Sequence, residues 1–349
     1  FSVQGVSSDE MAVTQKGGDW YDGGIWLDMH RHTYTPANGA FNGTWGQLYG
    51  GINECNTQLK ADPSANQKAQ LRALRAYFYF RLLDVYGRVK LVTESSATAP
   101  QSDRTTVFNF VESELLSVLG ISGVSASMDL SGSDLALDDN KYRINQYAAM
   151  GILAKLYLNA EVYTGSARWQ EAYDAADYIV SGGPYMLSDS SVSVPNLGAR
   201  PGTDDPDNLV GYAAVFGANN ESNPEIVWSV AFDEVTGANM NFHHMTLHYS
   251  SQFTWNFTSQ PWNGYVALEE FYNSYDSNDQ RKANNFIVGE QTDFGGSTIV
   301  DYSDPSDPVL NYTPFVNELE PNAQRDGGAR LGKFSFKQFA RNDLDNDYP

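Results

Sequence analysis

Two segments of the sequence combine aromatic rings with carboxylate, amide and hydroxyl side chains. The first is a glycine-rich stretch in which Asp19 and Asp22 flank the aromatic residues, and the second, 249–265, interleaves rings with Ser, Gln, Asn and Thr. A sugar has apolar C–H faces surrounded by hydroxyl groups, so its binding site needs exposed rings with hydrogen-bonding groups at their edges. The residues that we predict to bind a sugar are Trp20, Tyr21, Trp26, Tyr249, Phe253, Trp255, Trp262 and Tyr265.

Some of these rings have an alternative place in the protein core. For Trp20 and Trp26 we weigh the core against the binding site, because glycine on either side anchors a packed ring poorly. Three further tryptophans lie on segments with regular apolar spacing, and we assign them to the core; they are Trp45, Trp169 and Trp228.

The histidines have spacings that a zinc site could use. His30 is followed by His32, and His243 and His244 are followed by His248. The second group would need a helix, which its neighbours favour little, and no matched carboxylate accompanies it. Structural or sugar-facing histidines are the preferred interpretation, so no metal and no obligatory cofactor is predicted.

Acidic residues in the last fifty positions could bind calcium through oxygen ligands. They are Asp304, Asp307, Asp343, Asp345 and Asp347. The segment lacks the glycine and terminal glutamate of an EF-hand loop. A solvated acidic surface is the simpler interpretation, and structural calcium is its alternative.

Charge and composition exclude several function classes. The 349 residues include 22 basic and 43 acidic side chains, a formal charge of −21, which repels nucleic acids and anionic lipid surfaces. Cys55 is the single cysteine, so there is no disulfide framework, and we expect a buried thiol in a helix over 49–59. Motifs of serine hydrolases, zinc proteases and phosphate-binding loops are absent from the sequence. A glycoside hydrolase with two suitably spaced carboxylates is the alternative that these motifs leave open.

Apolar spacing predicts four helices, over 67–86, 105–119, 144–162 and 168–180. The last two, separated by a Thr-Gly-Ser turn, resemble a tetratricopeptide hairpin with a lengthened turn. We expect Trp169, Ala172, Tyr173, Ala176 and Ile179 on the inner face of the last helix. Elsewhere we predict a loop over 17–26, a strand over 223–230 and a short helix over 266–275.

The fold class is therefore mainly α, with tetratricopeptide-like helical hairpins, long irregular loop insertions and a few short strands. We predict one domain over 1–349, with its helical repeat core mainly in 45–182. Loop-rich insertions that bind the ligand occupy 1–44 and 183–349. The ends at Phe1 and Pro349 suggest a processed or incomplete segment of a longer protein.

The stretch 71–87, LRALRAYFYFRLLDVYG, resembles the signature helix of the SusD/RagB family. Further stretches match in the order that the family shows; they are 8–10, 45–49 with Ile52, Asn53 and Asn56, 148–163, and 225–228. The segment 156–165 is especially similar to starch-binding members. Absent from the sequence are the family's signal peptide, its lipidated cysteine and the C-terminal part that completes the repeats.

The resemblance implies a non-catalytic glycan-binding protein at the surface of the outer membrane. It implies a lipid anchor outside this chain and delivery of the glycan to a SusC-type TonB-dependent transporter. The net charge favours a neutral glycan, and the resemblance tilts this expectation towards an α-glucan such as starch. A peptide-binding member of the same family is an alternative, which broad charged clefts in place of an aromatic arc would favour.

Overall fold

The chain folds into two units that are interleaved in the sequence. The computed structural model describes residues 1–94, 99–200, 202–232, 241–257, 259–301, 306 and 308–335. The helical unit consists of Phe41–Leu187 and Pro224–Val230. The loop-rich unit consists of Phe1–Ala40, Ser188–Asn223 and Ala231–Pro349. The prediction of a single domain over 1–349 stays a prediction.

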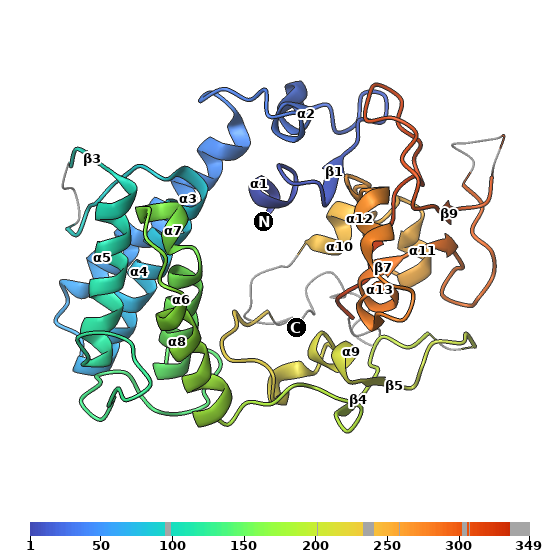
Figure 1. Ribbon diagram of the computed structural model, residues 1–349. Coiled ribbons are helices and arrows are strands. Elements are labelled where there is room, and N and C mark those ends of the chain that lie inside the picture. Colours follow the sequence, from blue (N-terminus) through green and yellow to red (C-terminus); the bar gives the residue numbers. More distant parts are fainter. Residues whose placement is uncertain are drawn as a thin grey trace. The chain divides into compact units, whose positions relative to one another are not determined.

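The helical unit is built from helices that pack in pairs (Figure 1). Its helices are α3 (Gly39–Leu59), α4 (Ala65–Tyr86), α5 (Arg104–Leu119), α6 (Gln146–Leu158), α7 (Ala160–Thr164) and α8 (Trp169–Gly182). Helix α4 packs on α5, α6 packs on α8, and α5 joins the pairs through α6 and α7. A short antiparallel pair, β2 (Val89–Lys90) with β3 (Gln101–Ser102), lies between α4 and α5 in the sequence.

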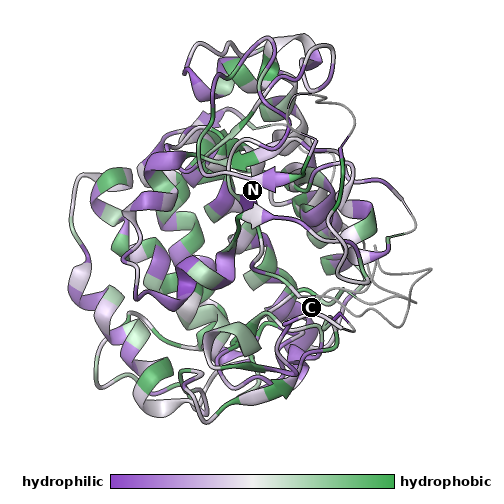
Figure 2. Ribbon diagram, turned by 90° about the vertical axis from the view of Figure 1, so that its right-hand side faces the viewer, coloured by the Kyte–Doolittle hydropathy of each residue, from purple (hydrophilic) through white to green (hydrophobic). Residues whose placement is uncertain are grey.

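Local side chains decide where these helices begin and end. Ser64 and Gln67 form a capping box at the start of α4, and the Asn145 side chain accepts a hydrogen bond from the Ala148 amide at the start of α6. Helix α4 ends at Gly87, whose φ of 73° suits glycine and whose amide donates to the Leu83 carbonyl. Figure 2 shows hydrophobic and hydrophilic residues alternating along the helices, as expected for helices with one buried face.

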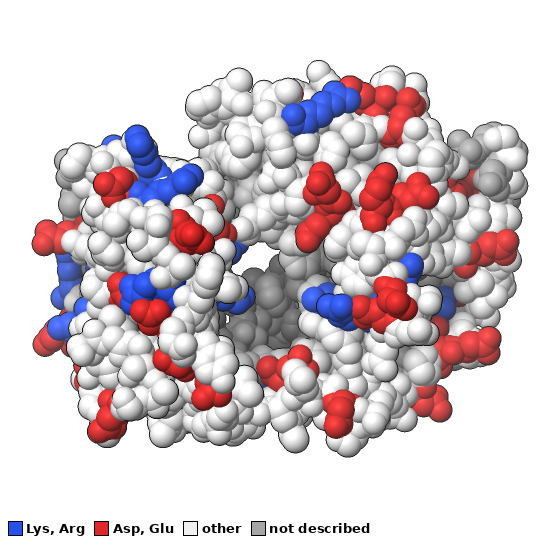
Figure 3. Space-filling view, in the orientation of Figure 1, with Lys and Arg blue, Asp and Glu red and all other residues white. Residues whose placement is uncertain are grey.

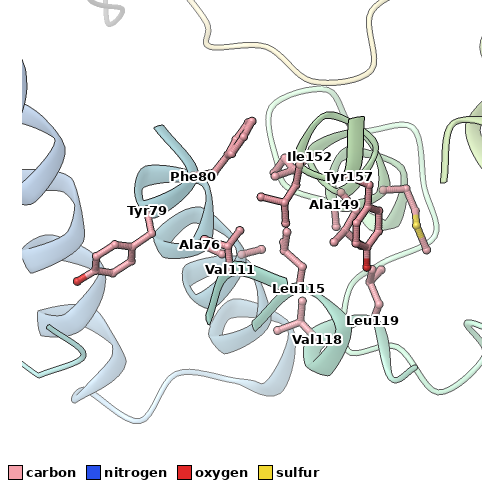
Figure 4. Close-up of a cluster of buried hydrophobic side chains, with 14 of the residues drawn as sticks. Ala76, Tyr79, Phe80, Val111, Leu115, Val118, Leu119, Ala149, Ile152 and Tyr157 are labelled. Atoms are coloured by element: carbon pink, nitrogen blue, oxygen red, sulfur yellow. The ribbon is translucent and has the colours of Figure 1, made fainter. Parts of the chain in front are cut away.

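The core of the helical unit lies between α4, α5 and α6. Figure 4 shows apolar side chains from these helices interleaved, among them Val111, Leu115, Ile152 and Tyr157. One carboxylate, Glu114, is buried beside this core and is held by Arg72 and Arg75, at 2.7 and 2.6 Å. Burial alone would raise the pKa of Glu114, but hydrogen bonds from both guanidinium groups outweigh it and hold the pKa below its usual value.

The loop-rich unit contains short elements joined by long irregular connections. Its helices are α1 (Ser2–Gly5), α2 (Ile25–His30), α9 (Tyr212–Val215), α10 (Phe242–Thr246), α11 (Ser251–Trp255), α12 (Glu269–Ser274) and α13 (Gln280–Asn285), with 3₁₀ turns η1 (Asp22–Gly24) and η2 (Asn220–Ser222). Its strands are β1 (Met11–Val13), β4 (Ser193–Pro195), β5 (Asn208–Val210), β6 (Tyr265–Ala267), β7 (Phe286–Ile287), β8 (Gly289–Glu290), β9 (Asn311–Tyr312) and β10 (Arg330–Leu331). They form four antiparallel pairs, β1 with β6, β4 with β5, β7 with β10 and β8 with β9.

The mainly α fold class is confirmed, and the four predicted helices lie within two residues of their expected starts. The predicted helix over 144–162 is divided at Asn159 into α6 and α7. Cys55 is a buried thiol on α3, and burial raises its pKa to about 11. No helix among the described residues is both long enough and apolar enough to span a membrane.

Three local predictions are wrong. The segment 223–230 forms bends and turns and no strand, although Trp228 does pack edge-on against Tyr77 at 5.1 Å. Part of the predicted loop over 17–26 is helical, because η1 and the start of α2 lie there. The segment 266–275 begins in β6 before the helix α12.

The predicted inner face of α8 is wrong in part, because Ala172 and Ile179 do pack in the core whereas the other three residues do not. Trp169 and Tyr173 are 62% and 64% exposed, and Ala176 is exposed as well. The buried face carries Ala172, Asp174 and Ala175. The helix is turned so that its small residues meet α6, which lets the two backbones approach, and the rings of Trp169 and Tyr173 face away.

Candidate functional site

The predicted aromatic residues of the two distant segments meet in the loop-rich unit. Antiparallel pairing of β1 with β6 sets Val13 opposite Tyr265, so the loop after β1 lies beside the segment that leads into β6. The rings of Trp20, Trp26 and Tyr265 then contact one another, with centroids 5.7 to 6.2 Å apart. Strand pairing over a separation of about 250 residues thus assembles the cluster.

Trp20 is the centre of this aromatic cluster. Its backbone has a φ of 58°, and its indole N–H donates to the carbonyl of Trp262. The indole ring lies directly over Gly264, where any Cβ would collide with it. Glycine is therefore needed at 264 for the tryptophan to pack there. The hydrogen bond from Trp20 also brings Trp262 into the cluster. Trp262 is 42% exposed, so its ring is available to a ligand.

A polar edge borders the aromatic cluster. The hydroxyl of Tyr249 donates to a carboxylate oxygen of Asp19, and the guanidinium of Arg325 lies 5.6 Å from the Tyr249 ring centre. Burial, and then the hydrogen bond to Asp19, raise the pKa of Tyr249, so the phenol stays protonated. Asp19 and Arg325 are exposed. The edge therefore offers a carboxylate and a guanidinium beside a ring.

A polar cavity of about 500 Å³ adjoins this edge. Its lining residues are Lys16, Gly17, Asp301, Val309, Leu310, Asn317, Asn322, Ala323, Gln324, Arg325 and Asp326. The backbone of Lys16 pairs with both Asp19 and Asn322, which ties the cavity to the aromatic loop. Amide, carboxylate and guanidinium groups in one hollow can pair with several hydroxyl groups at once.

Lys16 is a buried amine in the wall of this cavity. Its side chain donates to the backbone carbonyl and the hydroxyl of Thr14, at 3.0 and 2.6 Å. Burial, and then the positive charge of Arg330, lower the pKa of Lys16 to about 6. At neutral pH the amine is therefore mostly uncharged, and an uncharged amine can both donate to and accept from a hydroxyl group.

The structure separates the eight predicted residues into three groups. Trp20, Trp26, Tyr249 and Trp262 come together, and Tyr21 is 49% exposed on the same loop. Tyr265 also belongs to the cluster but is only 3% exposed and bonds to the Ser2 hydroxyl. That it contacts a sugar stays a prediction; its mostly buried ring packs against Trp20 and Trp26.

The remaining two predicted residues lie elsewhere in the unit. Phe253 is 61% exposed on α11, and no ring contact joins it to the aromatic cluster within the described part of the chain. Trp255 packs against the second hydrophobic cluster, around Leu247 and Phe257, with the Arg200 guanidinium 5.1 Å from its ring centre. Both rings follow the segment's aromatic pattern and lie on helix α11.

Sequence reasoning missed the cavity residues. Lys16, Asn322, Gln324 and Arg325 belong to two polar stretches about 300 residues apart, and nothing in their local pattern marks them. The short run Asn-Ala-Gln-Arg at 322–325 carries the right side-chain types for hydroxyl recognition. Only its backbone bridge to the Lys16 loop gives that run a place in a site.

The three histidines of the second predicted group are buried. His243, His244 and His248 are all buried, the first two on the five-residue helix α10, where the sequence favoured helix little. His248 lies 3.0 Å from a carboxylate oxygen of Asp301, and burial lowers its pKa to about 3. The described ranges hold no group of three or more His, Cys, Asp or Glu side chains placed for a metal. The calcium candidates Asp304, Asp307, Asp343, Asp345 and Asp347 lie outside the described residues.

Comparison with known proteins finds similar sequences. Residues 4–158 match the SusD-like family model described as starch-binding and associating with the outer membrane. Over this part of its sequence the chain is similar to SusD-like proteins. A relative, SusD-like protein P25 of Formosa agariphila, is 22% identical over 236 residues, which cover 66% of this chain and 34% of the relative. The chain thus spans about a third of that SusD-like protein.

Solved structures share the fold of this chain. A laminarin-binding SusD-like protein superposes with a TM-score of 0.65 at 20% identity, over 99% of this chain and 70% of its own. The surface glycan-binding protein A of Bacteroides uniformis superposes with a TM-score of 0.67 at 18% identity, over 99% and 66%. The likeness extends over both units and shows the fold of the SusD-like family.

Proposed function

We propose that this SusD-like protein binds a glycan at the aromatic cluster and the adjoining polar cavity. The observation that carries the proposal is the meeting of Trp20 and Trp262 beside the edge formed by Asp19, Tyr249 and Arg325. Exposed rings cover the C–H faces of sugars, and the edge groups bind hydroxyls. The names of the laminarin-binding and glycan-binding neighbours are consistent with this use of the fold.

Within this site we assign separate tasks to its members. Trp262 and Tyr21, which are 42% and 49% exposed, supply ring faces for the sugar. Arg325, Asn322 and Gln324 in the cavity supply donors and acceptors for its hydroxyl groups. Trp20, Trp26 and Tyr265 hold the exposed rings in place from beneath. A rigid ring platform lowers the entropy that the protein loses when the sugar binds.

The ligand that we favour is a neutral glycan, with an α-glucan as the first candidate. The net charge of −21 opposes uronic and sulfated polymers. In Figure 3, acidic side chains lie singly or in small groups over the face shown, with basic side chains among them. The cavity itself carries the carboxylates of Asp301 and Asp326 against the guanidinium of Arg325, because Lys16 is mostly uncharged at neutral pH, so its charge also opposes an anionic polymer.

The test is a binding panel with ring variants. Wild-type protein is measured by affinity electrophoresis and calorimetry against amylopectin, laminarin, xyloglucan, pectin and a mixed-peptide control. Trp262→Ala should weaken binding about ten-fold, because a stacked ring contributes ~0.5–1.5 kcal/mol beyond the area that it buries. Phe253→Ala removes a more exposed ring outside the cluster and should bind as the wild type does.

Four results would contradict the proposal. Binding that Trp262→Ala leaves intact would place the site elsewhere. Tight binding to pectin without binding to neutral glucans would overturn the neutral ligand. Release of reducing sugar from any bound polymer would make the protein a glycoside hydrolase, and selective retention of peptides would favour the peptide-binding alternative.

We further propose that the complete protein is lipid-anchored at the cell surface and works with a SusC-type transporter. Delivery to a transporter calls for a long-lived interface, which typically buries more than ~2,000 Å². Purification from the native outer membrane in mild detergent should recover both proteins together. Recovery of this protein alone, from an extract that contains the transporter, would overturn the partnership.

A further inference from the structure

The helical unit contains a second hollow, of about 480 Å³, which the glycan-binding proposal does not use. It lies where the end of α3, the start of α4 and the segment before α6 meet. Its lining residues are Gln58, Ala61, Pro63, Gln67, Gln70, Leu71, Leu74, Tyr142, Arg143, Ile144 and Trp228. All of them belong to the helical unit.

One face of α4 forms the floor of this hollow. Gln67, Gln70, Leu71 and Leu74 are spaced by three and four residues, so they lie along a single stripe of the helix. Leu71 and Leu74 are only half-buried, whereas Ala69 and Ala73, on the opposite face, are completely buried in the core. The floor therefore combines apolar surface with two amide groups.

The aromatic wall is held in place by contacts behind it. Trp228 meets Tyr77 edge-on at 5.1 Å, and the Ser229 amide donates to the carbonyl of Lys141 at 2.8 Å. That bond ties the segment of Trp228 to the segment of Tyr142. On the other side, the Asn66 side chain donates to the carbonyl of Asp134 at 2.9 Å. The hollow is thus formed by segments joined to one another by hydrogen bonds.

The polar groups of the hollow are suited to a ligand rich in hydroxyls. Tyr142 is 53% exposed, so its ring can cover a sugar face. Arg143 is exposed, and its guanidinium has no hydrogen bond or ion pair within the described part of the chain. No acidic side chain lines the hollow, although the protein as a whole carries a charge of −21. A guanidinium fork can donate to two neighbouring hydroxyls, as planar amides can.

We propose that this hollow is a second oligosaccharide-binding site, built on α4, Tyr142 and Trp228. The proposal rests on the proposed function in that the same glycan is its ligand. Tyr142 and Trp228 cover the sugar ring, Leu71 and Leu74 contact its C–H groups, and Arg143 and the glutamines bind its hydroxyls. A long polymer with two binding sites on one protein is retained more strongly than a short fragment that fills only one.

Tyrosine nitration tests both sites in a single wild-type sample. Tyr21 reports on the aromatic cluster, Tyr142 reports on the second hollow, and Tyr173, which is 64% exposed on α8, is the matched control. The folded protein is treated with tetranitromethane alone or with saturating maltoheptaose, laminarihexaose, a xyloglucan heptasaccharide or oligogalacturonate. Mass spectrometry of peptides then gives the nitration rate of each tyrosine.

The expected result is that one oligosaccharide slows nitration of Tyr142 at least about five-fold while the rate at Tyr173 is unchanged. Protection of Tyr21 without protection of Tyr142 would overturn the second site and leave the proposed function intact. Protection of Tyr142 alone would support the second site and overturn the assignment of the first. Protection of neither tyrosine by any of the four probes would overturn both.

Variants give an independent measurement of the same site. Tyr142→Ala in the Trp262→Ala background should abolish the oligosaccharide binding that remains in the single variant. In the otherwise wild-type protein it should weaken polymer retention about ten-fold. Tyr173→Ala, an equally exposed tyrosine of the same unit, should change neither value. Unchanged polymer retention by Tyr142→Ala would overturn the second site.

Discussion

The two units of this protein are stabilised in different ways. The helical unit has a continuous apolar core to which every helix from α3 to α8 contributes. The loop-rich unit has a much smaller apolar cluster, around Leu247, Phe257 and Tyr312. Its interior also contains charged or ionisable groups, among them Lys16, His248 and the completely buried Arg330. One unit relies on hydrophobic packing, and the other relies much more on partnered polar groups.

This difference places the candidate glycan site in the unit with the less regular structure. Long connections can present rings and polar groups from distant parts of the sequence at one place, as loops commonly do in binding sites. The fully buried guanidinium of Arg330 is an example of a polar group that holds such a connection in place. It donates to the Arg325 carbonyl and lies 5.0 Å from the Tyr312 ring centre. The polar interior thus positions the same segment, 325–330, that borders the cavity.

The largest loss of stability is expected at the buried ion pairs of Glu114 in the helical unit. Glu114→Ala removes the carboxylate that binds Arg72 and Arg75 and leaves the almost buried Arg75 without its charge partner. We expect a loss of ~3–5 kcal/mol in the free energy of unfolding, measured by urea denaturation. Glu320→Ala breaks the exposed pair with Arg31 and is the control, with a much smaller expected loss. Equal losses in the two variants would show that burial does not distinguish these ion pairs.

The next effect is a pH dependence of stability, caused by the buried Lys16 in the loop-rich unit. Because the folded pKa of Lys16 is lowered to about 6 from 10.5, the unfolded chain binds the extra proton between these values. The contribution of Lys16 to the free energy of unfolding should therefore rise with pH across this window, by up to ~1.4 kcal/mol per unit, and level off below pH ~6. Subtracting the pH profile of Lys16→Met isolates this slope. Parallel profiles would mean that the folded amine is solvated.

A smaller effect is expected at the start of α6 in the helical unit. The Asn145 side chain accepts from the Ala148 amide and donates to the Asp138 carbonyl, both at 2.8 Å. Asn145→Ala should cost ~1–2 kcal/mol of stability, because the first turn of the helix loses its cap. Asn145→Asp keeps the acceptor and should recover part of the loss in thermal denaturation. If Asn145→Asp is as unstable as Asn145→Ala, the bond to Asp138 is the one that matters.

The smallest effect is expected at Trp169. Its ring is 62% exposed on the outer face of α8, so Trp169→Ala should change stability by less than ~0.5 kcal/mol. A core tryptophan would cost ~3–5 kcal/mol on the same change. Thermal melts of the purified variant decide between the two. A drop in melting temperature like that of a core variant would show that other residues cover this ring in the complete protein.

The sequence determined the helices and the likeness to SusD-like proteins, because both depend on local patterns. Apolar residues at three- and four-residue spacing identify α4 and α5, and Ser64, Asn145 and Gly87 mark helix ends through bonds to neighbouring residues. The same local pattern misled at α8, where the large rings of Trp169 and Tyr173 share a face but the small Ala172 and Ala175 are buried. Periodicity shows that a helix has faces, and the neighbouring helix decides which of them it covers.

The tertiary structure alone decided how the candidate site is composed. The sequence shows aromatic residues in two separate segments, 19–26 and 249–265, and does not show which of them meet. The pairing of β1 with β6 brings Trp20, Trp26, Tyr249 and Trp262 together. The same pairing buried Tyr265, which by composition is as suitable for a sugar as its neighbours. Contacts between residues hundreds of positions apart produce no periodic pattern in the sequence, because they depend on how distant segments pack together. The sequence therefore shows that the residue types suited to glycan binding are present. The fold decides which of these residues come together and which are exposed.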